Sequence, residues 1–452
     1  CIARAQSAAA GPHQFYGVSG KIDELRFFDY PLGADEVYGV YRLHADDRVP
    51  AIAKTDVGAS YSFDHVAHPL ADGGPLNKSL MIQGPSASSY GVDRAGVWGN
   101  CLTLGEGETH NYPYGRMPKT AGTTQFNNAF TFAAWIKPTF VQGRHYYIVS
   151  CDRDLADATN GGFSLRINDG ADTARRLKGE IQYLNGGVPT KISIGGSSGA
   201  YLPNNQWSHV ALVFTGTKLR LYLNGQEYVS EANASVTMTT PTYDVCLGVL
   251  AYNAPYWYGY KGDMDQVLLV NRAMNSEEIA GLARPFKLYT ANPIRDKWIL
   301  PESLPYDLKP VSTGGRGVDV TALPGQYQPA TLVIQAHTLG DLQAVTVSAD
   351  NLTSASSTIY ANDIDIKLVK CWWQGYGDDL LFTTQPELKP ELLVNDASWI
   401  TVPATAPTIS SSGTTTNPNT VAGETTSTGP MDATSLQSVT LGAGNAQQYW
   451  LT

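Results

Sequence analysis

The sequence has few charged residues and few cysteines, and it lacks any long apolar run. Only 16% of its 452 residues are charged, and the formal net charge is −10. No basic stripe with interleaved aromatic residues occurs, so we expect no nucleic-acid partner. No stretch approaches the roughly 18 consecutive apolar residues of a membrane-spanning helix, so no transmembrane segment is predicted.

The five cysteines are far apart and odd in number. None forms a CxxC or Cys/His pattern, which argues against a zinc site and against thioredoxin-like chemistry. We interpret them as small apolar side chains buried in strands. A disulfide of Cys101 or Cys151 is the alternative, which the spacing does not decide.

The composition favours an all-β protein of an extracellular or virion-type surface. Glycine (44) and tyrosine (25) are frequent, and several segments are rich in Thr and Ser. A chain of this length is expected to form two or three domains. The absence of a signal peptide and of an initiating Met indicates a mature or excised piece of a longer chain.

Strand signals dominate residues 59–270. "NAFTFAAWIKP" (128–138) is an apolar run closed by proline, and residues 206–228 read as two strands followed by an Asn224-Gly225 turn. One short helix is predicted at "NSEEIAGLA", capped by Asn275 or Ser276. Strands about ten residues apart without helical periodicity predict an antiparallel sandwich.

Three blocks carry a resemblance to a known family. "FTFAAWIKP", "NNQWSHVALVF" and "GYKGDMDQVLLVNRAMNSEEI" resemble, in the same order, signatures of the LamG-like (concanavalin A-like lectin/glucanase) jelly roll. The resemblance covers residues 58–285 and implies two curved antiparallel sheets, a closing strand and a short helix.

The closing block occurs twice. Residues 16–41 match residues 258–283 at an offset of 242 without a gap. We therefore expect residues 1–45 to be the C-terminal remnant of a preceding LamG-like domain, joined by a linker at 46–57.

A different composition begins after the jelly roll. Residues 286–310 read as a proline-rich linker, and residues 311–452 as a second β-sandwich that resembles the accessory N-terminal domain of some large glycoside hydrolases. Its Thr/Ser-rich stretch 403–436 is too poor in apolar residues to form a core. We expect this domain to be truncated at its C-terminus. The predicted fold class is all-β, with tandem antiparallel β-sandwiches and few short helices.

No catalytic constellation is found. Some jelly rolls of this class are glycosidases with the strand pattern E-x-D-x-x-E, but the corresponding strand here reads "DMDQ" (263–266). Asp265 is expected to anchor backbone amides of a loop. His209 beside Trp207 is interpreted as a packed residue rather than a base. Whether the parent chain is an enzyme is left open.

Two loops carry candidate ligand sites. Sugar rings stack on exposed aromatic rings, and their hydroxyl groups bind to amides. This predicts a carbohydrate-binding loop formed by Tyr252, Asn253, Tyr256, Trp257 and Tyr260. The alternative is that this loop is a rim packed over the edge of the sandwich. Oxygen ligands at close spacing predict a calcium site, with a solvated acidic loop as the alternative: Asp152, Asp154, Asp157 and Asn160.

Two adjacent tryptophans, Trp372 and Trp373, should lie on opposite faces of one strand. One is expected in the core, and the other at an interdomain contact or on a ligand platform.

These observations favour a non-catalytic carbohydrate-binding or adhesion segment of a large extracellular multidomain surface protein, with a glycan or polysaccharide as partner. One alternative is a structural or assembly protein, such as a phage fibre, a virion decoration or a cell-surface filament, which would bind other subunits. Another is the accessory part of a glycoside hydrolase whose catalytic domain lies downstream. We expect an extracellular location, or one on the surface of a cell or virion.

Overall fold

The computed structural model describes residues 57–452 with gaps, of which the longest are 118–128, 152–161, 375–385 and 407–418. The predicted remnant at 1–45 and most of the predicted linker therefore lie outside the described residues. The described strands are antiparallel and form sandwiches with few helical turns, which confirms the predicted fold class.

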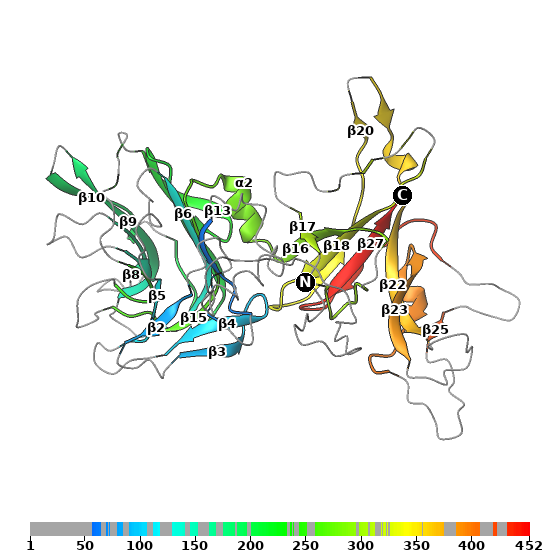
Figure 1. The fold of residues 1–452 in the computed structure, drawn as a ribbon, viewed down its shortest axis with the longest axis horizontal. Coiled ribbons are helices and arrows are strands. Elements are labelled where there is room, and N and C mark those ends of the chain that lie inside the picture. The colour runs from blue at the N-terminus through cyan, green and yellow to red at the C-terminus, as the bar shows by residue number, and fades with distance from the viewer. Residues whose placement is uncertain are drawn as a thin grey trace, which may run out of the picture.

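The jelly roll consists of two sheets packed face to face (Figure 1). The eight-stranded sheet has the order β13 (Gln226–Ala232), β12 (Lys218–Leu223), β11 (Ser208–Phe214), β6 (Phe130–Pro138), β15 (Gly262–Val270), β4 (Asn100–Leu104) and β3 (Tyr90–Ala95), with β1 (Val57–Tyr61) paired to β15. The seven-stranded sheet has the order β10 (Val188–Gly195), β9 (Arg176–Asn185), β8 (Gly162–Asn168), β7 (His145–Ser150), β14 (Val245–Leu247), β5 (Tyr114–Met117) and β2 (Met81–Gln83).

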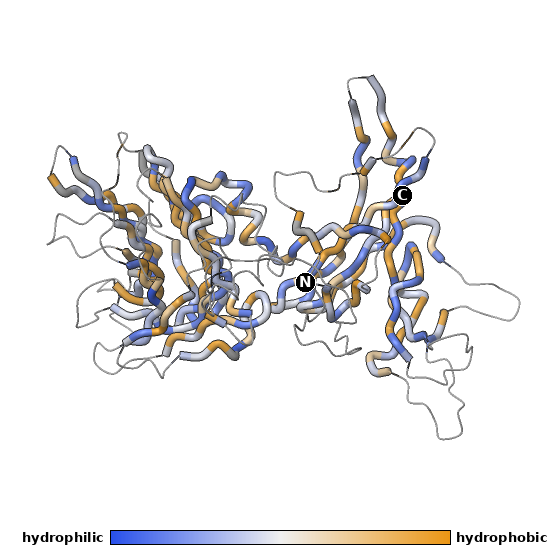
Figure 2. Tube along the Cα trace, in the orientation of Figure 1, coloured by the Kyte–Doolittle hydropathy of each residue, from blue (hydrophilic) through white to orange (hydrophobic). Residues whose placement is uncertain are grey.

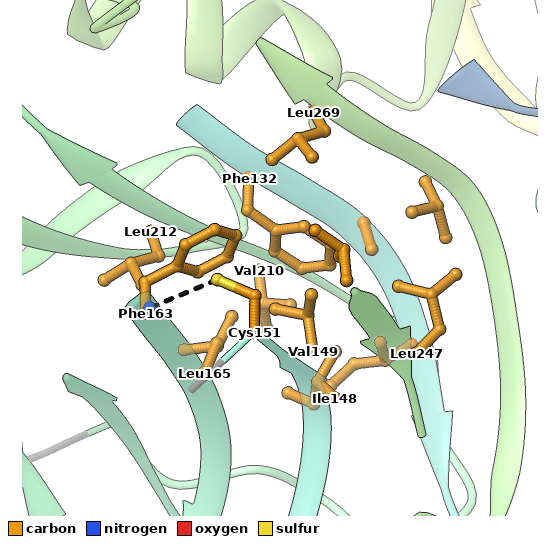
Figure 3. Close-up of a cluster of buried hydrophobic side chains, with 14 of the residues drawn as sticks. Phe132, Ile148, Val149, Cys151, Phe163, Leu165, Val210, Leu212, Leu247 and Leu269 are labelled. Atoms are coloured by element: carbon orange, nitrogen blue, oxygen red, sulfur yellow. Dashed lines mark hydrogen bonds between the residues drawn. The ribbon is translucent and has the colours of Figure 1, made fainter. Parts of the chain in front are cut away.

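The main core fills the space between these two sheets. Alternate residues of β6, such as Phe130 and Phe132, point into it and meet Phe163 and Leu165 of the facing sheet. Figure 3 shows this packing, including the buried Cys151, whose Sγ accepts a hydrogen bond from the Phe163 amide at 3.3 Å.

The cysteines behave as the sequence predicts. The four that the structure describes are buried and free of disulfides: Cys101, Cys151, Cys246 and Cys371. Burial raises the pKa of the Cys246 thiol to about 12, so it stays protonated and unreactive at neutral pH.

The outer face of the eight-stranded sheet is covered by helix α2 (Ser276–Leu282). Asn275 caps it: its side chain accepts from the amide of Glu278, whose carboxylate accepts in return from the Asn275 amide. Ile279 packs into a second apolar cluster with Ala133 and Leu268. In Figure 2 apolar residues recur along the strands of both sheets, interspersed with polar ones.

Turn chemistry sets the hairpin between β12 and β13. Asn224 and Gly225 have φ angles of +49° and +82°, the pair of positive values that a type I′ turn requires. The predicted Asn-Gly turn is therefore confirmed.

The second unit is built around a six-stranded sheet (Figure 1). Apolar clusters pack against both faces of this sheet. Its order is β17 (Lys309–Pro310), β16 (Phe286–Ala291), β18 (Ala330–Ala336), β27 (Ala446–Leu451), β22 (Ile366–Gln374) and β23 (Glu387–Val394). Three strand pairs surround it: β19 (Leu342–Val345) with β26 (Val439–Leu441), β20 (Leu352–Thr353) with β21 (Thr358–Ile359), and β24 (Ile400–Thr401) with β25 (Thr420–Val421). The described part of this unit also contains two 3-10 turns: η3 (Ala361–Asp363) and η4 (Ala397–Trp399).

The two units meet at the turn between β3 and β4. The Thr338 amide donates to the Val97 carbonyl at 3.0 Å. The Lys287 ammonium lies 4.3 Å from the centroid of the Trp98 ring, and the His337 ring packs edge-on against the same indole. A cation–π contact and a backbone hydrogen bond thus join the jelly roll to the second sandwich.

Candidate functional site

The closing strand β15 uses its carboxylates for structure. Asp265 is fully buried, and its Oδ2 accepts the amide hydrogens of Val97 at 2.7 Å and Trp98 at 2.9 Å. This confirms that Asp265 anchors a loop. Asp263, also buried, accepts from the Thr103 hydroxyl at 2.8 Å and lies 3.5 Å from the Lys137 ammonium.

His209 is a packed residue, as predicted. It is buried and its ring packs edge-on against Trp135, with centroids 5.5 Å apart. Burial lowers the pKa of His209 to about 3, so the ring is neutral at physiological pH. No substrate can reach a base in this position.

The predicted aromatic loop is largely outside the described residues, which leaves Tyr252, Asn253, Tyr256 and Trp257 as predictions. The prediction that Tyr260 binds a sugar is wrong. Its ring is fully buried in the main core, and its hydroxyl donates to the Asp263 carbonyl at 3.0 Å. A ring in this position cannot stack on a sugar.

The calcium prediction also falls outside the described residues, because Asp152, Asp154, Asp157 and Asn160 all lie in the 152–161 gap. Within the part of the chain that the structure describes, no three His, Cys, Asp or Glu side chains lie close enough together to hold a metal ion. Nor does any described helix have the length and apolarity needed to cross a membrane.

The outer face of the seven-stranded sheet carries a polar surface formed by residues outside the two predicted loops. Leu177 and Ile181 of β9 point into the main core, so alternation turns Lys178 and Glu180 to the opposite side. Strand register then brings polar residues of three strands together. Glu180 is paired with Ser164 of β8 and Ser193 of β10, while Lys178 is paired with Arg166 of β8.

Glu180 is the centre of a buried charge network, here called the Glu180 cluster: Arg166, Lys178, Glu180, Lys191 and Ser193. The Glu180 carboxylate lies 2.9 Å from both lysine ammonium groups and 3.5 Å from the Arg166 guanidinium, and it accepts from Ser193 at 2.9 Å. Three cations surround one carboxylate. The cluster therefore carries two positive charges in excess, in a chain whose net charge is −10.

These contacts set the protonation states. Burial alone would raise the pKa of Glu180, but the charges of Arg166 and Lys191 and the lysine hydrogen bonds outweigh it and lower the pKa to about 2. The pKa of His145 is lowered by burial and by the positive charges of Arg166 and Lys178. At neutral pH, Glu180 is ionised and His145 is uncharged.

Aromatic rings lie beside this cluster. The Tyr258 ring is 41% exposed, and its centroid lies 5.3 Å from that of His145 and 6.2 Å from that of Tyr147. The Arg166 guanidinium lies 5.5 Å from the Tyr147 ring centroid and so connects the rings to the charges. Of the two described tyrosines of this segment, Tyr258 reaches the surface and Tyr260 does not.

Among the described residues, three buried polar atoms of this face have no hydrogen-bond partner: His145 Nδ1, Ser164 Oγ and Arg166 Nε. Buried polar groups are nearly always paired, by protein or by water, so each of these atoms has capacity for a further hydrogen bond, to water or to a ligand. The face combines exposed aromatic surface, excess positive charge and unsatisfied polar atoms.

Sequence reasoning missed the Glu180 cluster. Its members are separated by up to 27 positions, and only the register of β8, β9 and β10 brings them together. A signal was present in the alternation of "LKGEIQ" (177–182), where Lys178, Glu180 and Gln182 occupy every second position. Strict alternation marks one face as polar, but it does not tell whether the charges are paired.

The comparisons with known proteins identify the jelly roll. Residues 109–280 match the family model described as "Concanavalin A-like lectin/glucanases superfamily". This part of the chain is therefore a concanavalin A-like jelly roll, as the resemblance implied. No curated protein matches the chain.

Several solved structures are similar at low identity. Domain 4 of AbnA, an extracellular arabinanase of Geobacillus stearothermophilus in complex with arabinotriose, is 20% identical, with 51% of this chain and 98% of that chain covered and a TM-score of 0.36. The CBM40 of the Ruminococcus gnavus IT-sialidase bound to alpha2,3 sialyllactose is 15% identical, with 36% and 87% covered and a TM-score of 0.30. The binding domain of Paraclostridial Mosquitocidal Protein 1 is 16% identical, with 76% and 74% covered and a TM-score of 0.38.

Proposed function

We propose that this chain is a non-catalytic glycan-binding segment of an extracellular, multidomain surface protein. The binding site is assigned to the outer face of the seven-stranded sheet, around Tyr258 and the Glu180 cluster. The observation that carries the proposal is the exposed Tyr258 ring, which lies over His145 and Tyr147 directly beside a network with two excess positive charges.

Sugars are recognised by this combination of groups. The apolar face of a pyranose ring stacks on an exposed aromatic ring, while its hydroxyl groups need charged or polar partners. Tyr258 supplies the ring, and Arg166, Lys178 and Lys191 supply donors that Glu180 holds in place. Because these cations outnumber the carboxylate, we expect preference for a glycan that carries carboxylate or sulfate groups.

Two further observations support a binding role without catalysis. The carboxylates of the closing strand are buried and engaged with backbone amides, a hydroxyl and cations. The family that residues 109–280 match includes lectins by its description, although a fold by itself does not determine function.

The proposal is tested by glycan-array screening of the full chain, followed by calorimetric titration of the best acidic glycan and of its neutral analogue. We expect Tyr258→Ala to weaken binding about tenfold or more, as is typical for an aromatic anchor. The matched control is Tyr228→Ala, because Tyr228 is 52% exposed but lies on β13 of the other sheet. Equal affinity in wild type and Tyr258→Ala would refute the assignment of the site.

A second candidate function, assembly with other copies of this chain, is favoured by the β20–β21 hairpin. Leu352 and Ile359 are paired across it and are 58% and 53% exposed, and the adjacent Tyr360 is 61% exposed. Figure 1 shows β20 projecting from the second sandwich. Apolar side chains on a projecting arm are typical of contacts between proteins.

Sedimentation velocity over a range of concentrations tests this role. Self-association that Leu352→Asp abolishes would support it. Leu323→Asp is the control, because Leu323 is 68% exposed outside the hairpin. A chain that stays monomeric at high concentration would exclude assembly through this hairpin.

A further inference from the structure

The second sandwich contains a cavity of about 650 Å³ that the proposed function does not use. It lies between the segment 298–303, strands β22, β23 and β27, and residues 402–404. Small-molecule sites typically enclose about 300–1,000 Å³, so the cavity has the size of a ligand site.

Two tryptophans form part of its wall. The Trp373 indole N–H donates to the Pro403 carbonyl at 2.8 Å, and its backbone amide donates to Asn419 Oδ1 at 3.1 Å. With its N–H engaged, the Trp373 side chain can offer a ligand only its ring. Trp298 is 42% exposed, and the Lys389 ammonium lies 5.2 Å from its ring centroid.

Two charged side chains that line the cavity are left without partners. Lys370 and Glu387 are both half-buried, and neither forms an ion pair or a side-chain hydrogen bond among the residues that the structure describes. Burial lowers the pKa of Lys370. Partly desolvated charges without partners are costly, so both groups are suited to bind polar atoms of a ligand.

The charges around the cavity balance. The lining contains one cation, Lys370, and two carboxylates, Glu302 and Glu387. The Lys389 ammonium, which lies 5.2 Å from the Trp298 ring centroid, brings the sum to zero. This differs from the Glu180 cluster, where cations are in excess. A ligand with net charge would gain little here, whereas hydroxyl groups can accept from an ammonium and donate to a carboxylate.

We propose that this cavity is a second ligand site, which binds a short neutral oligosaccharide between Trp298 and Trp373. The sugar rings stack on the indoles, and their hydroxyl groups hydrogen-bond to Lys370 and Glu387. The site is separate from the one on the jelly roll and goes beyond the proposed function.

The test is calorimetric titration of the full chain with neutral hexasaccharides of glucose, xylose, mannose, galactose and arabinose, and with phenylalanine as a zwitterionic aromatic probe. We expect at least one hexasaccharide to bind, and Trp298→Ala to weaken it about tenfold or more. Glu387→Gln should also weaken it, because the amide oxygen is a poorer acceptor than the carboxylate.

Two controls separate this site from its surroundings. Trp372→Ala changes the adjacent tryptophan, which lies outside the cavity lining and donates to Glu391 at 3.2 Å, and it should leave the affinity unchanged. Tyr258→Ala should also leave it unchanged, whereas it should weaken an acidic glycan at the jelly roll. Failure of one site is thereby distinguished from failure of the other.

Three results would overturn the proposal: no neutral hexasaccharide binds, binding is the same in Trp298→Ala and wild type, or phenylalanine alone binds. The last result would assign the cavity to a zwitterion.

Discussion

Asp265 is expected to make one of the largest single contributions to the stability of the jelly roll. Its Oδ2 accepts two buried amide hydrogens, from Val97 at 2.7 Å and Trp98 at 2.9 Å. Asp265→Ala removes this acceptor and leaves both N–H groups without a partner. Each unsatisfied buried group costs about 1–3 kcal/mol, so we expect the free energy of unfolding to fall by about 4 kcal/mol.

The pH dependence of this contribution follows from the pKa. Burial and the neighbouring Asp64 carboxylate raise the pKa of Asp265 from 3.8 to about 8, against the amide donors of Trp98 and Gln266. Between these values the folded state binds more protons than the unfolded state. The stability contributed by Asp265 is therefore fully present below about pH 4 and is lost as the pH rises to about 8.

Guanidinium unfolding, followed by tryptophan fluorescence at pH 5 and pH 8, measures both effects. Wild type should lose stability between these pH values relative to Asp265→Asn, which has no carboxyl proton to lose. Amide exchange at residues 96–100 reports the anchored turn directly and should be much faster in Asp265→Ala. The control is Asp263→Asn, because Asp263 on the same strand accepts from a side chain rather than from this turn.

A loss below about 1 kcal/mol in Asp265→Ala, less than one unsatisfied buried group costs, would refute the anchoring argument. Unchanged exchange at residues 96–100 would refute it as well.

Three further predictions concern other parts of the chain. The pKa of Glu180 is lowered from 4.5 to about 2, so the carboxylate should contribute about 3 kcal/mol to the free energy of unfolding above pH 4.5. This contribution should be lost as the pH falls toward 2. In urea unfolding, Glu180→Gln should lack this acid dependence. Gly225→Ala should lower the melting temperature in calorimetry, because φ is +82° and a Cβ would meet the backbone of α2 at 3.0 Å, whereas Gly340→Ala, with open space around it, should not. Thr338→Val removes the hydroxyl that donates to the Gly96 carbonyl, so we expect a loss of about 1 kcal/mol and faster amide exchange at the junction.

Local signals allowed much of the jelly roll to be predicted. Pro138 closes β6, the Asn224-Gly225 pair forms the predicted turn, and Asn275 caps the predicted helix. The anchoring role of Asp265 was also predicted. Each of these features depends on residues within a few positions of one another or on a family motif, so one sequence suffices.

The candidate site could not be predicted in the same way. The aromatic composition of residues 256–260 predicts that some of these rings are exposed, but it does not predict which ring points into the core. The backbone decides this: Tyr258 has a φ of +66° and remains exposed, while Tyr260 enters the core.

The tryptophan pair gives a similar lesson. The described contacts of Trp372 and Trp373 stay within the second sandwich, and the tryptophan at the junction is Trp98. Strand register and domain packing determine such contacts, and a short sequence motif predicts neither of them.

The contact between the two sandwiches determines how the two proposed glycan sites lie relative to each other. The turn that contacts the second sandwich belongs to the eight-stranded sheet, so the seven-stranded sheet lies at the far end of the molecule, while β22 and β23 lie at the other end (Figure 1). The two proposed sites lie toward opposite ends of the molecule, so they cannot both engage one short oligosaccharide and add no avidity on such a ligand. If both proposed sites bind their ligands, they can bridge two separate chains, and we expect the protein to cross-link a mixture of an acidic and a neutral polysaccharide into a network.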